Sequence, residues 1–174
     1  MPVHTHDFDQ IAPQFLERAN RMVWCSAATI DGSGRPRSRV LHPIWEGSTG
    51  WITTDPTSPK SHDLARNPWM SLAWTSDVAK PAFADCRAEW VNDPATKQHV
   101  WDLCKRTPEP LGFDPTPIYG SPDETTPGRP TFGVLRLVPY RITLTQWPEP
   151  ILIWTPDDED AWFAAAEARI AGVA

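Results

Sequence analysis

Short apolar runs, separated by turns rich in glycine and proline, dominate the chain. Polar and apolar residues alternate across 82–91, where Cys86 and Ala88 fall on one face and Arg87 and Glu89 on the other. This period of two residues is typical of a half-buried β-strand. Other apolar or β-branched runs predict further strands at 22–30, 37–45, 50–54, 69–76, 132–144 and 151–154.

Helical spacing of apolar residues appears first at 8–22, where Ile11, Phe15, Ala19 and Met22 recur every three or four positions. Pro13 is expected in the first turn of that helix, where a missing N–H is harmless. Three further helices are predicted, over 61–67, 94–106 and 157–171.

Proline is abundant, at 20 of 174 residues, and its lack of a backbone donor argues against a long helical bundle. Seven of the prolines lie in 107–130, which is too long for a plain connection and predicts a lid or a partner contact. The other connections are short. We therefore expect one domain over 1–174, mainly β with short flanking helices, in which an antiparallel sheet closes into a small barrel.

The net charge of the chain limits the classes of partner that it is expected to bind. The 16 basic and 22 acidic residues give a net charge of −6, which repels a phosphate backbone. A small barrel that binds single-stranded nucleic acid through aromatic residues is therefore disfavoured. No apolar run approaches the length of a membrane span, and the first residues lack a signal-peptide pattern. We expect a cytoplasmic protein.

Metal chemistry has little support in the sequence. The cysteines, Cys25, Cys86 and Cys104, are odd in number and widely spaced, which argues against a disulfide framework or a zinc site. His4 and His6 are expected in an unstructured tail rather than as ligands.

A candidate anion site lies between the second predicted strand and the helix that follows the third. Arg37 and Arg39, two residues apart, share one face of the strand. Lys60 falls in the first turn of the helix after Ser58, and Thr53–Thr54 ends the strand before it. Two guanidinium groups, an ammonium group and free helix amides suit a phosphate. The alternative is that these are solvated surface charges.

The ordered runs GRPRSRVLHPIW, GWITT, TSPKSHDLARNP and MSLAW make the signal more specific. In this order they resemble the pyridoxamine 5′-phosphate oxidase-like FMN-binding split-barrel family. The resemblance implies a six-stranded antiparallel Greek-key split barrel. It also implies a homodimer that binds FMN in two clefts at the dimer interface.

The resemblance assigns roles to individual residues. Arg39 and Lys60 match the cations that bind the cofactor phosphate, and Ser58 matches the hydroxyl of the same turn. Val40 and Leu41 match the backbone segment beside the isoalloxazine ring. Arg37 has no counterpart in the family and is included only because it shares a face with Arg39.

Two further pairs complete the predicted cofactor site. Thr53 and Thr54 match the strand end near the ribityl chain and phosphate. Gln146 and Trp147 stand near the late-strand Trp-Gln pair of the family, with the tryptophan one residue late. Pro59 replaces a second cation, and the Arg-x-His substrate signature is absent, so the resemblance is to the broad family.

The implied activity is that of a flavin-dependent oxidoreductase, in which the cofactor exchanges a hydride with an unidentified small molecule. His42 is a candidate for orienting that substrate, against the alternative of a structural or solvated histidine. A deazaflavin coenzyme is an alternative cofactor, and Arg87 and Arg136 are candidates for binding its acidic tail. A protein that only binds a flavin, haem or tetrapyrrole is the remaining alternative.

Overall fold

One β-sheet and five helices form the described part of the chain. The computed structural model describes residues 1–171, with side chains to residue 169. The strands are β1 (Val3–Thr5), β2 (Cys25–Ile30), β3 (Pro36–Leu41), β4 (Ile44–Glu46), β5 (Thr49–Thr54), β6 (Trp69–Trp74), β7 (Ala82–Val91), β8 (Gly133–Gln146) and β9 (Glu149–Trp154). The helices are α1 (Phe8–Met22), α2 (Pro59–Arg66), α3 (Pro94–Arg106), α4 (Thr116–Tyr119) and α5 (Glu159–Ala171).

Most of the sheet closes on itself as a barrel. β6 pairs with β2 on one side and β7 on the other, β7 pairs with β8, and β8 pairs with β5, all antiparallel. The ring closes through β3, which pairs with β2, and β4, which pairs with β5. Only His42 and Pro43 separate β3 from β4. The predicted six-stranded barrel is thus confirmed if β3 and β4 count as one bent strand. The whole sheet has nine strands because β9 and β1 extend one edge.

The first residues form a strand that the sequence did not predict. β1 pairs in parallel with β9, so His4 belongs to the sheet. Nδ1 of His6 lies 3.0 Å from the carbonyl oxygen of Thr155. The expectation of an unstructured tail was wrong, because an edge strand can pair its free backbone groups with almost any extended segment.

Three prolines shape the elements. The predicted strand 37–45 is divided at Pro43, which cannot donate to the ladder. The register between β7 and β8 shifts next to Pro139, which has no backbone N–H to donate to the ladder. Pro13 lies in the second turn of α1 rather than the first, because the helix begins directly after its cap, Asp7.

Helix α1 supplies one side of the barrel core. Ile11, Phe15 and Ala19 are buried on one helix face, as their spacing predicts. The Phe15 ring packs edge-on against Trp45 and Trp74, with ring centroids 4.8 and 5.8 Å apart. This contact joins the helix to side chains from β4 and β6 and fixes it against the barrel.

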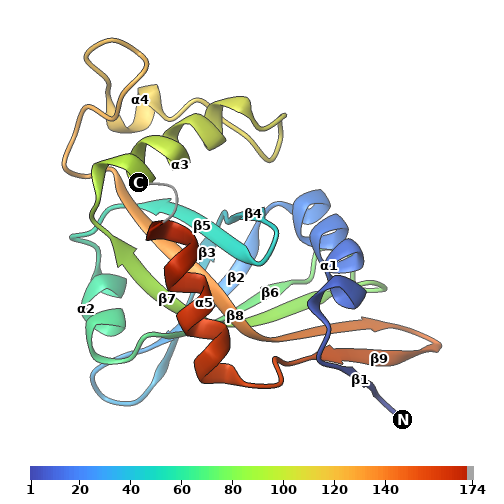
Figure 1. The fold of residues 1–174 in the computed structure, drawn as a ribbon. Coiled ribbons are helices and arrows are strands. Elements are labelled where there is room, and N and C mark those ends of the chain that lie inside the picture. The colour runs from blue at the N-terminus through green and yellow to red at the C-terminus, as the bar shows by residue number, and fades with distance from the viewer. Residues whose placement is uncertain (172–174) are drawn as a thin grey trace.

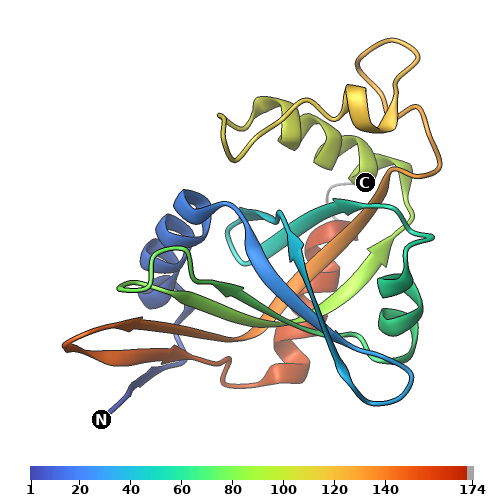
Figure 2. The same cartoon turned by 180° about the vertical axis from the view of Figure 1, so that it is seen from behind.

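The remaining helices cover the outside of the barrel. Figures 1 and 2 show α3 and α4 beyond one end of the barrel, and α5 along its outer face. Residues 133–139 of β8 are all buried, because α3 and α5 pack on this strand. The Phe132 ring lies edge-on to Trp101 of α3 and Tyr119 of α4, at centroid distances of 5.2 and 5.0 Å. The segment 107–130 is therefore anchored to the barrel rather than free.

Candidate functional site

A buried polar pair holds Arg39 in place on β3. Its Nη1 donates to Thr29 Oγ1 over 2.7 Å, and its Nη2 lies 3.4 Å from Asp63 Oδ2. Thr29 also donates to Asp63 Oδ2 over 2.9 Å. Both Thr29 and Asp63 are buried. This arrangement fixes the guanidinium at the junction of β2, β3 and α2.

Lys60 lies in the first turn of α2 and is buried, with 8% of its surface exposed. Burial lowers the pKa of its ammonium, and the charge of Arg39 lowers that pKa further, whereas Asp55 raises it. Lys60 and Arg39 therefore act on one another. Lys60 donates to Ser58 Oγ over 2.7 Å and forms no ion pair with a carboxylate of residues 1–169. Two cations in one environment, one of them without an ion pair, suit an anionic group.

Ser58 does not act as a helix cap, and Arg37 is not a free surface charge. Ser58 occupies the N-cap position of α2, but its side chain makes no capping bond and accepts from Lys60 instead. Arg37 is exposed, and its Nε donates to Asp31 Oδ2 over 2.9 Å in the turn between β2 and β3. Ser58 therefore lies against Lys60, whereas Arg37 is paired with Asp31.

A cavity of about 420 Å³ begins one residue beyond Arg39 on β3 and one residue before Thr54 on β5. Four of its lining residues were predicted from the sequence, and the segment 107–130 supplies four others. The lining residues are Trp24, Val40, Leu41, His42, Thr53, Pro110, Phe113, Ile118 and Tyr119.

His42 is the central polar residue of this cavity. Its ring packs against the rings of Trp24 and Phe113, at centroid distances of 4.8 and 5.4 Å. Its Nε2 is buried without a hydrogen-bond partner. Burial lowers the pKa of His42, and the backbone of Leu111 partly offsets this effect. The imidazole is therefore neutral near pH 7.

Several lining residues were not predicted from the sequence. Trp24 immediately precedes β2, and 58% of its surface is exposed. Phe113 and Tyr119 belong to the proline-rich segment, which was predicted only to cover something. The signal that could have found them is the presence of aromatic residues among rigid prolines in a connection of this length.

Gln146 and Trp147 lie at the opposite end of β8 from the cations. Thr54 pairs with Gly133, the first residue of β8, whereas Gln146 is the last. The thirteen residue-to-residue steps between them span roughly 40 Å along an extended strand. Trp147 follows in the turn to β9 and is 93% exposed. One chain therefore does not bring this pair together with the rest of the predicted site.

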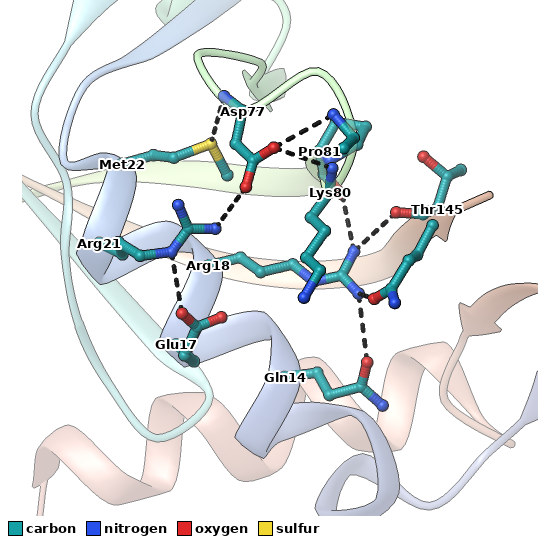
Figure 3. A network of polar contacts seen from close by, with 11 residues as sticks. Gln14, Glu17, Arg18, Arg21, Met22, Asp77, Lys80, Pro81 and Thr145 are labelled. Carbon is teal, nitrogen blue, oxygen red and sulfur yellow. Dashed lines mark hydrogen bonds and ion pairs between the residues drawn. The ribbon is translucent and has the colours of Figure 1, made fainter. Parts of the chain in front are cut away.

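A buried arginine holds this distant end of β8. Arg18 of α1 is 4% exposed, and its Nη1 donates to the carbonyl oxygens of Pro81 and Thr145 over 3.1 and 2.8 Å. Its Nη2 donates to the side-chain oxygens of Gln14 and Gln146 over 3.2 and 3.3 Å. Figure 3 shows this guanidinium between the helix and the strand ends. Arg18 binds the oxygen of the Gln146 amide and not its nitrogen.

Arg87 and Arg136 are engaged outside the cavity. Arg136 is buried and donates to the Glu89 carboxylate and, over 3.0 Å, to the carbonyl oxygen of Ala166 in α5. Arg87 pairs with Glu89 and with Glu167 of α5, at 2.6 and 2.8 Å. Both arginines attach α5 to the barrel, so neither is available along the cavity.

The thiols are shielded from solvent. All three cysteines are free and buried, and burial raises the pKa of Cys25 and Cys104 to about 12. Over the described residues, no group of three or more metal-binding side chains occurs. Within residues 1–171, no helix combines the length and apolar character needed to cross a membrane.

The closed antiparallel barrel places the protein in the class of split-barrel folds. A family model described as pyridoxamine 5′-phosphate oxidase matches residues 11–146. The chain therefore belongs to the pyridoxamine 5′-phosphate oxidase family, whose fold is that of flavin-binding oxidoreductases. A comparison with curated proteins finds no match.

Solved structures agree with this fold. A pyridoxamine 5′-phosphate oxidase-related FMN-binding protein from Nostoc punctiforme is 20% identical, with a TM-score of 0.59 over 82% of this chain and 85% of that chain. A protein from Listeria innocua, described as a putative pyridoxamine 5′-phosphate oxidase, is 19% identical, with a TM-score of 0.57 over 79% and 96%. An F420 reductase is 16% identical, with a TM-score of 0.53 over 74% and 94%.

Proposed function

We propose that the protein binds FMN between two copies of the chain and acts as an oxidoreductase on a small molecule. The observation that carries this proposal is the combination of two neighbouring cations, Arg39 and Lys60, with an apolar cavity whose lining on β3 begins at Val40, the residue after Arg39. A phosphate joined to a flat, mostly uncharged ring system has this same division between charge and apolar surface.

The residues present fit such a cofactor. Lys60, Arg39 and the hydroxyl of Ser58 would bind the phosphate, and Thr54 ends the strand beside them. The β3 segment at Val40 and Leu41, which lines the cavity, would lie beside the ring. When bound, the flavin supplies the redox chemistry by accepting or donating a hydride. The protein would orient the ring and exclude water from it.

A second copy of the chain would complete the site. If Gln146 and Trp147 contact the same flavin as Lys60, they must come from the partner, because β8 separates them within one chain. The exposed surfaces of Trp24, Val40 and Trp147 would then be covered in the dimer. A homodimer with two equivalent sites follows from this arrangement.

A deazaflavin is the second candidate cofactor, and the similarity to an F420 reductase favours it. Its acidic tail would require additional cations. Arg87 and Arg136 are engaged beneath α5, so the chain does not offer them for this purpose. We therefore favour FMN.

Native mass spectrometry of the protein as purified tests the proposal directly. We expect a mass of two chains with two FMN molecules, and release of free FMN on denaturation. A dimer that carries no flavin and binds only added deazaflavin would replace FMN by that coenzyme. A monomer that binds neither would contradict the proposal. Reduction of the bound flavin by added NADPH, followed by reoxidation, distinguishes an enzyme from a protein that only binds its cofactor.

A further inference from the structure

A buried arginine that forms no ion pair within residues 1–169 lies at the far end of β8. Arg18 is 4% exposed, and its Nη atoms donate only to neutral oxygens, two from backbone carbonyls and two from side-chain amides. The carboxylates of Glu17 and Asp77 pair with Arg21 instead. Because an arginine keeps its proton in a protein, a positive charge is held here among amide and carbonyl oxygens (Figure 3).

One of these acceptors is the side chain of Gln146, the last residue of β8. Nη2 of Arg18 donates to its Oε1 over 3.3 Å. A guanidinium has only donors, so it can bind the oxygen end of an amide but not the nitrogen end. No other hydrogen bond within residues 1–169 involves the Gln146 side chain. Arg18 therefore determines which way this amide is turned.

The Gln146 side chain is also accessible to a ligand. It is partly exposed and borders two hollows of the surface, one of about 240 Å³ that Arg18 also lines and one of about 420 Å³ that Trp147 also lines. The NH₂ group of a glutamine carries two donors. With the oxygen held by Arg18, the end of the amide that can still bind a ligand is a donor.

We propose that Arg18 is a positioning residue for the cofactor, which turns the Gln146 amide so that its nitrogen donates to the flavin bound at the partner's cations. This inference rests on the proposed function, in which Gln146 reaches the flavin across the dimer. A flavin ring becomes richer in electrons when it is reduced. A donor directed at it, with the charge of Arg18 behind that donor, stabilises the reduced form more than the oxidised form. Arg18 thereby raises the reduction potential of the bound flavin.

Gln146→Glu separates the two contacts of the amide. A carboxylate still accepts from Arg18, so the flavin-free variant should unfold in urea no more easily than the native chain. It cannot donate to the flavin, and its charge opposes reduction. At saturating FMN, equilibration with redox dyes should show that the preference for reduced over oxidised flavin falls at least about tenfold, which lowers the potential by about 30 mV. An unchanged potential overturns the proposal.

Gln14 of α1 provides the matched control. It is exposed, and its Oε1 also accepts from Nη2 of Arg18, over 3.2 Å. Gln14→Glu places the same charge against the same guanidinium, at a residue with no proposed contact to the flavin. The potential should shift by less than about half as much as in Gln146→Glu. Equal shifts in the two variants overturn the proposal, because they would show a general effect of added charge.

A double-mutant cycle tests the role of Arg18 itself. Arg18→Gln replaces the guanidinium by an amide, which can bind either end of the Gln146 amide, and should lower the potential. In a Gln146→Met background the same substitution should have little effect, because the amide that Arg18 turns is gone. Equal shifts in the two backgrounds overturn the proposal. If Arg18→Gln does not fold, the comparison of Gln146→Glu with Gln14→Glu decides alone.

The flavin content of the native protein separates this inference from the proposed function. A native dimer that binds FMN, with a potential that does not depend on Gln146, keeps the function and loses the inference. A native protein that binds no FMN loses the proposed function, and the inference fails with it.

Discussion

Lys60→Met removes the cation on which the proposed phosphate site depends and keeps most of the side-chain length. Lys60 is 8% exposed, so its stem packs against neighbours that methionine can also contact. The change therefore isolates the charge. It should weaken FMN binding and leave the fold intact.

The magnitude follows from the environment of the ammonium. A hydrogen bond to a charged group contributes about 1.5–3 kcal/mol, which corresponds to a roughly 10- to 150-fold loss in affinity. Burial reduces screening by salt, so most of this effect should persist at physiological ionic strength. The stability of the flavin-free protein should not decrease. Because burial and Arg39 lower the pKa of Lys60, the folded state disfavours its charge, and the variant should unfold no more easily than the native chain.

Fluorescence titration with FMN and with riboflavin measures the effect, since the two ligands differ only in the phosphate. Lys60→Met should reduce the affinity for FMN and leave that for riboflavin unchanged. Lys80→Met, which removes an exposed lysine from the turn between β6 and β7, should affect neither ligand. An equal loss for FMN and riboflavin would show that Lys60 supports the fold rather than the phosphate. No loss for FMN would place the phosphate elsewhere.

Three other predictions test the surrounding structure. Arg18→Met should lower the free energy of unfolding in urea by roughly 2–5 kcal/mol, because two carbonyl oxygens lose a buried donor. The control Arg21→Met, which removes an exposed ion pair, should lower it much less. Equal losses would contradict the structural role of Arg18. Burial holds the pKa of His42 below 6.5, so its contribution to stability is present above that pH and is lost as the pH falls toward the folded pKa. Thermal melts between about pH 7.5 and pH 5 should therefore show a weaker pH dependence for His42→Phe, and parallel curves would refute this. The three buried cysteines should not react with Ellman's reagent until the protein is unfolded, and rapid labelling of the native protein would contradict their burial.

Strand and helix positions could be predicted from the sequence wherever side-chain periodicity decides the structure. Alternation located β7 at its observed bounds, and the spacing of Ile11, Phe15 and Ala19 located α1. Errors arose where backbone hydrogen bonding decides instead. Pro43 divides the segment 37–45 into two strands, although the pattern of side chains predicts one continuous strand. β1 joins the sheet through backbone hydrogen bonds, which no side-chain pattern predicts.

The candidate site was predictable only in part for a similar reason. Arg39 of β3 and Lys60 of α2, three elements later, could be expected together because the ordered motifs imply their proximity. Gln146 could not be placed, because the sequence does not reveal how far β8 extends beyond its pairing with β5. Phe113 escaped prediction because a proline-rich segment has no periodicity from which its path can be inferred.

The two ends of the site therefore depend on different parts of the chain. The cationic end is built from β3 and α2, whose geometry is fixed by barrel hydrogen bonds and by the buried Thr29–Asp63 contact. The aromatic end depends on the segment 107–130, which is held to the barrel through Tyr119 and Phe132. A change in that segment can alter the shape of the cavity without moving Lys60. The affinity for a phosphate at Lys60 and the shape of the cavity at Phe113 should consequently be separable by substitution.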